Sequence, residues 1–187
     1  MEKRRCEWCL KDDLYMKYHD EEWGIPSHDD QHLFEHLILE TFQAGLSWYT
    51  ILSKRQNFRK AFHGFDPLKI AAMDDVQVDQ LMLDAGIIRS RPKILAAISN
   101  ARIFLDIQKE FGSFDNYVWS FTDHKTIYIE VKERSDVQTT IPESDAMARD
   151  MKKRGFKFVG STTCMAYMEA VGMVNDHFTY CWKHSKN

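Results

Sequence analysis

The sequence lacks the features that mark secreted and membrane-spanning proteins. Its first ten residues, MEKRRCEWCL, are charged and contain no apolar stretch of the kind found in a secretory signal. No apolar run elsewhere approaches the length of a membrane span. Only four cysteines occur among 187 residues, at positions 6, 9, 164 and 181. We therefore expect a cytoplasmic protein with no membrane association, whose cysteines are free or metal-bound rather than paired in disulfides.

A strong excess of charge of one sign is also missing. The formal net charge is −3, so the overall charge does not indicate a nucleic-acid partner. Basic residues are nonetheless grouped within 54–60, 89–93 and 152–157. Such groups usually form solvated helix faces, and they permit a DNA partner without indicating one.

Helical periodicity is the dominant pattern, over a length that suits one domain, with room for two lobes. One apolar stripe predicts a single helix that carries Leu33, Leu37, Ala44 and Trp48. A second helix is expected to begin at Ser90 as its N-cap, with Pro92 in the first turn.

A third helix is expected to be capped by Ser144 or Asp145 and to stop at Gly155, and a fourth to begin after residues 160–163. Only TIYIEV (126–131) alternates like a strand, and a lone strand has no partner for pairing. No internal repeat or low-complexity tract interrupts the chain. The pattern predicts an all-α fold.

Two good metal ligands, His177 and Cys181, are four residues apart near the end of the sequence, so in a helix they would share one face. The N-terminal region offers Cys6 and Cys9 in CEWC and His19 in YHDEEWG. Two thiolates and two imidazoles complete a tetrahedral zinc shell, and a complete shell is typical of a structural site. No His-Glu-x-x-His helix is present to suggest a hydrolytic zinc.

The ligand set is open at two positions, because Cys9 could replace Cys6 and His184 could replace His177. A single Zn²⁺ would in either case join the first helix to the last and close a loop of nearly the whole chain. The set that we favour is Cys6, His19, His177 and Cys181.

Glu40 falls on the apolar stripe, between Leu37 and Ala44. A buried carboxylate is costly, so this one must be paired, protonated or facing a cavity. Aromatic residues occur on the same stripe and near the N-terminus: Trp8, Tyr18, Trp23 and Trp48. If a pocket exists there, the rings can stack on a flat cationic ring while the carboxylate accepts its N–H groups.

The segment 78–101, VDQLMLDAGIIRSRPKILAAISNA, predicts a helix, a tight turn at Gly86 and a second helix. Gly86 supplies the positive φ that a close hairpin requires. The turn places backbone amides beside Arg89, Arg91 and Lys93, which suits a phosphate oxygen of DNA. Spacing alone favours a plain helical hairpin without a role in DNA binding.

These segments together resemble one family, the type I 3-methyladenine DNA glycosylases of the helix-hairpin-helix superfamily. The resemblance covers almost the whole chain. It rests on several motifs in order, namely YHDEEWG (18–24), QAGLSW (43–48), FDP (65–67), DAGIIR (84–89), KKRGFKFVG (152–160) and GMVNDH (172–177).

The resemblance implies one glycosylase domain over residues 1–187. One lobe would combine the N- and C-terminal segments around a structural Zn²⁺, and a central helical lobe would hold the helix-hairpin-helix at about 76–105. The implied zinc ligands are Cys6, His19, His177 and Cys181. The implied base pocket is Glu40, Tyr18 and Trp48, with Trp8 and Trp23 as further wall positions. The implied DNA contacts are Gly86, Ile87, Arg89 and Lys93.

The implied activity is excision of 3-methyladenine from alkylated double-stranded DNA by a monomeric enzyme that flips the base, with Glu40 as the catalytic residue. No Gly-Pro-Asp sequence follows the hairpin, and no motif places a lysine for a Schiff base. We therefore expect a monofunctional glycosylase that uses water and leaves an abasic site. The alternatives are a zinc-fastened DNA-binding module without catalysis and a zinc hydrolase.

Overall fold

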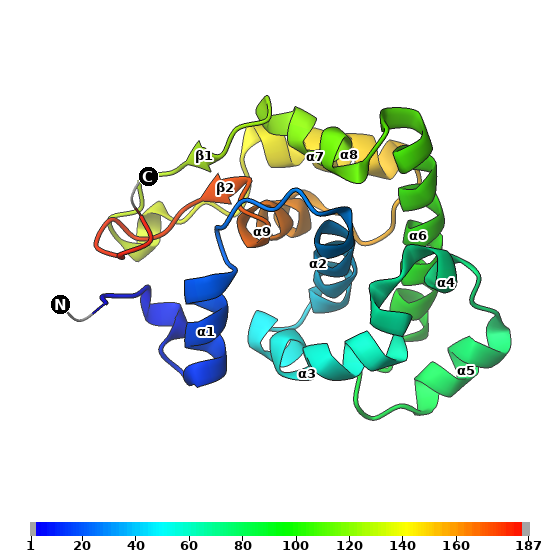
Figure 1. Ribbon diagram of the computed structural model, residues 1–187. Helices are drawn as coiled ribbons and strands as arrows, with labels where there is room; N and C mark the ends of the chain where they lie inside the picture. The colour runs from blue at the N-terminus through cyan, green and yellow to red at the C-terminus, as the bar shows by residue number, and fades with distance from the viewer. Residues whose placement is uncertain (1–2, 185–187) are drawn as a thin grey trace.

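The computed structural model describes residues 3–184 and is mostly helical, as the periodicity predicts (Figure 1). The α-helices are α1 (Asp13–Glu21), α2 (Asp30–Gln43), α3 (Trp48–Ala61), α4 (Pro67–Ala71), α5 (Asp75–Leu83), α6 (Arg91–Phe111), α7 (Phe114–Trp119), α8 (Pro142–Lys153) and α9 (Ser161–Ala170). Short 3-10 turns are η1 (Glu7–Cys9), η2 (His63–Phe65), η3 (Ser120–Thr122) and η4 (Arg134–Asp136).

Helix α2 lies at the centre of the molecule, with α9, α3 and α6 around it (Figure 1). Every residue from 33 to 42 is buried, so this helix is enclosed on all sides rather than along one stripe. It begins at the Asp29 cap, whose carboxylate accepts the amides of Gln31 and His32. The central position of α2 brings Glu40 into the interior.

The expected single helix through Leu33 and Trp48 is wrong, because the chain breaks after Gln43. Gly45 has φ +78°, a conformation that favours glycine, and Ser47 caps a new helix by accepting the Thr50 amide. Trp48 therefore begins α3 instead of continuing α2. The glycine that ends one helix and the serine that caps the next both lie in the QAGLSW segment (43–48).

Two other expected boundaries shift. Helix α8 begins at Pro142, and Ser144 lies inside its first turn, where its hydroxyl bonds the Ile141 backbone instead of capping from outside. Helix α9 already includes residues 161–163, so it begins earlier than expected. The lone strand is also wrong: β1 (Ile127–Tyr128) pairs in parallel with β2 (Val174–Asn175).

The C-terminal segment packs along the N-terminal one, and both ends lie on the same side of the molecule (Figure 1). The Trp182 amide donates to the Arg4 carbonyl at 2.9 Å, and the Lys183 ammonium donates to the Asp20 carbonyl at 3.1 Å. His177 and Cys181 do not share a helix, since the chain after β2 runs through bends and turns. Their proximity comes from tertiary packing.

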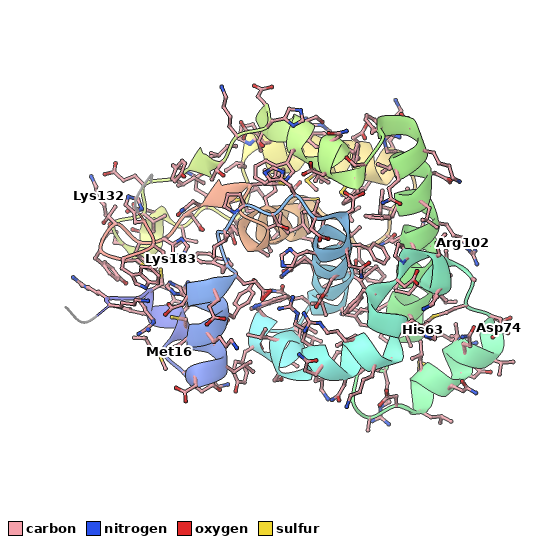
Figure 2. All side chains as sticks on the ribbon, viewed as in Figure 1. Met16, His63, Asp74, Arg102, Lys132 and Lys183 are labelled. Atoms are coloured by element: carbon pink, nitrogen blue, oxygen red, sulfur yellow. The ribbon has the colours of Figure 1, made fainter. Side chains whose placement is uncertain are left out.

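In Figure 2, Lys132 and Lys183 lie at the end that holds the termini, whereas Asp74 and Arg102 lie at the opposite end, near α4, α5 and α6. A single cluster of buried apolar side chains extends from α2 through α6 to α8 and α9. Among residues 3–184, no helix is long and apolar enough to cross a membrane.

Gly172 is expected to be one of the least replaceable residues of the fold. Its φ is +76°, and an added Cβ would lie 2.2 Å from the Ile25 carbonyl carbon and the Pro26 nitrogen. Gly172→Ala should therefore lower the free energy of unfolding by about 2–4 kcal/mol, measured by urea denaturation. The control is Gly64→Ala, where φ is +68° but the space is open, with an expected cost of about 1 kcal/mol. Equal losses would contradict the steric argument.

Candidate active site and metal centre

A cavity of about 220 Å³ opens between α1, the C-terminal end of α2 and α9. Its walls come from segments that are far apart in the sequence. The lining residues are Trp8, Tyr15, Tyr18, Trp23, Glu40, Gln43, Trp48, Val137, Ala166, Glu169, Asp176 and Phe178. All five residues expected from the sequence to form a base pocket are among them.

Glu40 lies on the cavity wall with 3% of its surface exposed. Within residues 3–184, no hydrogen bond or ion pair reaches its carboxyl group. Burial raises the pKa of Glu40 to about 8, so the free protein holds a protonated carboxyl group at neutral pH. Of the three sequence-based possibilities, pairing is excluded, and the side chain is both protonated and facing a cavity.

Aromatic rings form most of the wall opposite this carboxyl group. The Tyr18 ring lies 5.3 Å from Trp48 and 6.5 Å from Trp8, and the Trp8 ring lies 4.9 Å from Trp23, all between centroids. Burial, followed by the nearby Glu40 and Glu22 charges, raises the pKa of Tyr18 well above its usual value. Its hydroxyl is therefore a hydrogen-bond donor at every physiological pH.

Sequence reasoning missed several lining residues. Tyr15 precedes Tyr18 by one helical turn, and its ring lies 4.9 Å from that of Trp8. Glu169 and Asp176 add two more carboxyl groups to the cavity, and burial raises the pKa of each. Asp176 lies in the quoted GMVNDH motif and could have been noticed; Glu169 carried no signal.

Besides Glu40, three fully buried side-chain polar atoms of the lining residues have no hydrogen-bond partner. They are the amide oxygen of Gln43, the indole nitrogen of Trp48 and one carboxyl oxygen of Asp176, all buried. An unsatisfied buried polar atom costs roughly 1–3 kcal/mol. The cavity thus has donors and acceptors available for a polar ligand with flat faces.

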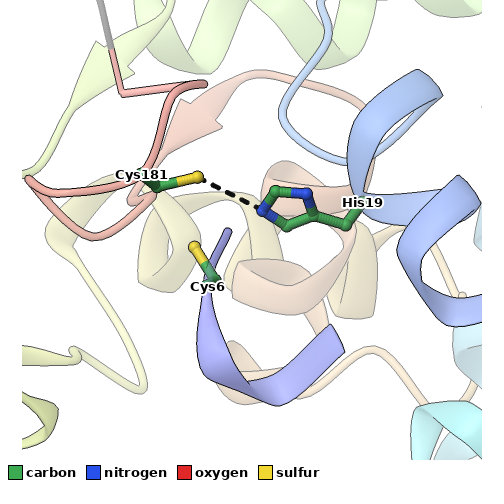
Figure 3. Close-up of side chains that lie close together, drawn as sticks. All are labelled: Cys6, His19 and Cys181. Carbon is green, nitrogen blue, oxygen red and sulfur yellow. Dashed lines mark hydrogen bonds between the residues drawn. The ribbon is translucent and has the colours of Figure 1, made fainter. Parts of the chain in front are cut away.

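A second group lies beside this cavity, where the termini meet (Figure 3). The donor atoms of Cys6, His19 and Cys181 all lie within 4.8 Å of one another, and all three residues are buried. The Cys181 sulfur is 3.4 Å from Nε2 of His19. The structure therefore brings together three of the four favoured metal ligands.

His177 is adjacent to this group but outside the cluster of three donors. Its ring centroid lies 5.0 Å from that of His19, and its Nδ1 bonds the Asn175 side-chain oxygen at 3.0 Å. Its Nε2 is buried without any partner. An unpartnered imidazole nitrogen beside a thiol–imidazole group fits a metal ligand. Gly24 permits this placement, because a Cβ there would lie 2.6 Å from the His177 ring.

The alternative ligands are engaged elsewhere. The Cys9 thiol donates to the Cys6 carbonyl at 3.1 Å, and Nδ1 of His184 lies 2.9 Å from the His177 carbonyl oxygen. Cys9 is outside the donor cluster that contains Cys6, and His184 has no unpartnered buried ring nitrogen of the kind that His177 offers. The geometry therefore favours Cys6 over Cys9 and His177 over His184.

The surroundings prepare the group for a cation. A hydrogen bond with Cys6 is the main reason that the pKa of Cys181 is lowered, which favours the thiolate form of this ligand. Nδ1 of His19 lies 2.9 Å from Asp20, whose carboxylate accepts three further bonds from Arg5. A carboxylate behind a histidine is a common way to orient a metal ligand.

The hairpin has the expected helix–turn–helix form, with α5 and α6 joined by residues 84–90. The expected positive φ at Gly86 is wrong. Glycine is needed there for space, since a Cβ would lie 2.9 Å from the Asp84 carboxylate and 3.1 Å from Asn57. The Gly86 amide donates to Asp84, and the side chain of Ile87 is buried.

The two cations that were expected to bind phosphate differ in their surroundings. Arg89 is exposed at the turn. Lys93 is only 9% exposed, and its ammonium donates to the carbonyls of Phe42 and Ala44 at 2.8 and 2.5 Å. Lys93 thus caps the end of α2 and is not available to DNA, which corrects its assignment as a phosphate contact. Burial lowers the pKa of Lys93.

The amino-acid sequence matches the family described as methyladenine glycosylase over residues 8–184. The chain belongs to the methyladenine glycosylase family. Among its relatives, DNA-3-methyladenine glycosylase 1 of Escherichia coli (strain K12) is 49% identical over 177 residues, which span 95% of each chain.

Solved structures of the methyladenine glycosylase family have the same fold. A crystal structure of 3-methyladenine DNA glycosylase I superposes with a TM-score of 0.94 at 49% identity, covering 97% of this chain and 100% of that one. A structure of the Staphylococcus aureus enzyme, which concerns 3-methyladenine recognition, gives 0.93 at 36% identity, covering 98% and 97%. The comparisons confirm the family inferred from the motifs.

The buried carboxyl group should make the stability of this methyladenine glycosylase fall with rising pH. Because the folded pKa of Glu40 is raised to about 8, the folded chain holds a proton that the unfolded chain loses above its ordinary pKa. Stability therefore declines from about pH 5 to about pH 8. Glu40→Gln should raise the free energy of unfolding by roughly 1–3 kcal/mol at the upper end and little at the lower. Denaturant titrations at both pH values would detect the difference; a gain independent of pH would contradict it.

Proposed function

We propose that the protein removes 3-methyladenine from alkylated double-stranded DNA by hydrolysing the N-glycosidic bond. The observation that carries this proposal is the unpaired Glu40 carboxyl group in a cavity walled by aromatic rings. Membership of the methyladenine glycosylase family makes the chain a hydrolase of N-glycosyl bonds, and its relatives carry the name of the 3-methyladenine enzyme. The proposed cellular location is the cytoplasm, and the proposed state is a monomer.

The base must leave the DNA stack to reach this cavity, and a lesion that weakens pairing lowers the cost of flipping. In this proposal Trp48 stacks on the flipped base, while Tyr18 and Glu40 form hydrogen bonds to its edge; all three residues line the cavity. A cationic base in the cavity would favour the ionised form of Glu40 through direct attraction. Glu169 and Asp176 add two carboxyl groups to the same wall, and burial raises the pKa of each.

The proposed chemistry needs modest help from the protein. Methylation at N3 makes adenine cationic and hence a good leaving group, so binding, orientation and exclusion of water supply most of the rate. Among the described residues that line the cavity there is no lysine, which supports hydrolysis by water without a Schiff base or strand cleavage.

The proposed cofactor is one structural Zn²⁺ held by Cys6, His19, His177 and Cys181. Three donors are clustered, and the fourth residue offers an unpartnered ring nitrogen beside them. Two sulfur and two nitrogen ligands with no solvent-facing position match a structural site. The ion would join the terminal segments, which already contact each other. A hydrolytic zinc site would instead require an open coordination position for a water molecule.

The proposed DNA contact is the hairpin turn, in a helix-hairpin-helix arrangement. Arg89 is exposed there, and within the described part of the chain the amides of Ile88 and Arg89 donate no hydrogen bond. Such groups hold a phosphate without reading the base sequence. A binding module without catalysis remains the alternative, but it leaves the buried Glu40 and its cavity without a purpose.

Glu40→Gln should abolish excision of 3-methyladenine while leaving the fold and metal content intact. The amide cannot supply negative charge to a cationic base, so the single-turnover rate on methylated duplex DNA should fall at least ~100-fold. Release of the free base by chromatography is the measurement. The control is Glu21→Gln on the exposed face of α1, which should release base at the wild-type rate. An active Glu40→Gln variant would remove this residue from the mechanism.

Loss of the metal should loosen the terminal segments before it affects chemistry. Cys181→Ser should reduce the zinc content measured by mass spectrometry and lower the melting temperature, since metal binding is coupled to folding. The buried Cys164 lies outside the donor group, so Cys164→Ser should keep the zinc. If zinc-free protein stayed folded at the assay temperature yet released no base, the ion would be catalytic instead of structural.

A further inference from the structure

A second cluster of potential metal ligands lies beside Tyr18 and Trp48 and is separate from the cysteine-containing group. Glu22 follows α1 directly, while His32 and His36 lie one turn apart on α2. Nε2 of each histidine is 3.5 Å from the same oxygen, Oε2 of Glu22. The three donor atoms all lie within 4.8 Å of one another.

These separations match metal coordination better than direct hydrogen bonding. An N–H···O hydrogen bond normally spans about 2.7–3.2 Å, so both 3.5 Å contacts are long. Around a tetrahedral ion with bonds of about 2.0–2.2 Å, neighbouring donors lie roughly 3.4 Å apart. The two histidines share one helix face, as ligands at i and i+4 do.

Unsatisfied nitrogen atoms provide an independent indication. His36 is completely buried, its Nδ1 has no hydrogen-bond partner, and its Nε2 has only the long 3.5 Å contact with Glu22. Leaving a buried polar atom without a partner costs roughly 1–3 kcal/mol. A metal ion at this position would satisfy Nε2 of His36.

Arg55 holds Glu22 in place. Its Nη1 donates to both carboxylate oxygens at 2.5 and 2.6 Å, and its Nε donates to Glu35 at 2.5 Å. Each carboxylate oxygen keeps a further lone pair for another partner. A hydrogen-bonded carboxylate is a well-oriented ligand, although the guanidinium charge weakens cation binding, which the Glu35 charge partly offsets.

We propose that Glu22, His32 and His36 bind a second divalent transition-metal ion of the zinc type. Imidazole and carboxylate donors in this combination suit zinc and cobalt(II). The side chains of Glu22 and His32 are 25% and 27% exposed, so an ion can enter and keep a water ligand on the solvent side. The site shares no residue with the cysteine-containing group.

An ion at this position would affect the cavity indirectly, through residues that contact its lining. The His36 ring stacks at 6.5 Å from Tyr18 and at 6.0 Å from Trp48, and both residues line the cavity. Fixing His36 would restrict the two rings that are proposed to hold the base. Metal at this site would therefore favour binding of a flat base over the empty cavity.

The test is metal binding to the full-length protein in the absence of DNA, which keeps it separate from the proposed excision activity. Zinc-loaded protein is titrated with zinc by calorimetry, and with cobalt(II) by visible absorption. Wild-type protein should bind one further ion, with cobalt bands that show no thiolate charge transfer. His32→Gln should weaken this binding at least ~10-fold. The matched control is His28→Gln, since His28 is exposed and pairs with Asp115 instead.

Two further variants complete the design. Glu22→Gln should weaken the same binding event, and Cys181→Ser should leave it in place while removing the other metal. A wild-type protein that takes up no further ion would overturn the proposal. So would binding that His32→Gln and Glu22→Gln leave unchanged. Far-ultraviolet circular dichroism of each variant would confirm that lost binding does not reflect lost folding.

Discussion

The burial of residues 33–42 of α2 is the constraint on which the rest of the structure depends. Charged side chains in this enclosed part of the helix cannot reach water. Each must therefore be paired within the protein or become neutral. Glu35 pairs with Arg55 and Arg59, and His36 faces Glu22. Among these residues, only Glu40 faces the cavity and has no ion-pair partner. The same enclosure that stabilises the helix makes one carboxyl group responsive to whatever enters that space.

The cavity depends on contacts between the two ends of the chain. Trp8, Tyr18 and Trp23 come from the first residues, whereas Glu169 and Asp176 come from the last. Backbone bonds hold these segments together: the amides of Gly24 and Ser27 donate to the carbonyls of Glu169 and Val171. The donor group of Cys6, His19 and Cys181 lies at the same junction. Closure of the termini and formation of the cavity are therefore one structural event.

Much of this arrangement was predictable from local pattern. Helical periodicity gave the fold class, and a carboxylate on an apolar face gave Glu40 as the anomalous residue. Features set by tertiary packing were not predictable. The pairing of β1 with β2 joins residues 46 or more positions apart, Lys93 is drawn to the end of α2, and Glu169 turns inward without any sequence signal. Gly45 is a sequence signal for the end of a helix. Leu37 and Trp48 nevertheless fit one helical stripe, and this periodicity led to the prediction of a single helix.

The distribution of wall residues has a consequence for biosynthesis. Because the ribosome releases the chain from its N-terminus, Tyr18, Glu40 and Trp48 emerge long before Asp176 and Cys181. Until the final segment is released, the cavity lacks Asp176 and Phe178 from its wall. The enclosure that raises the pKa of Glu40 is therefore completed only when the last residues pack.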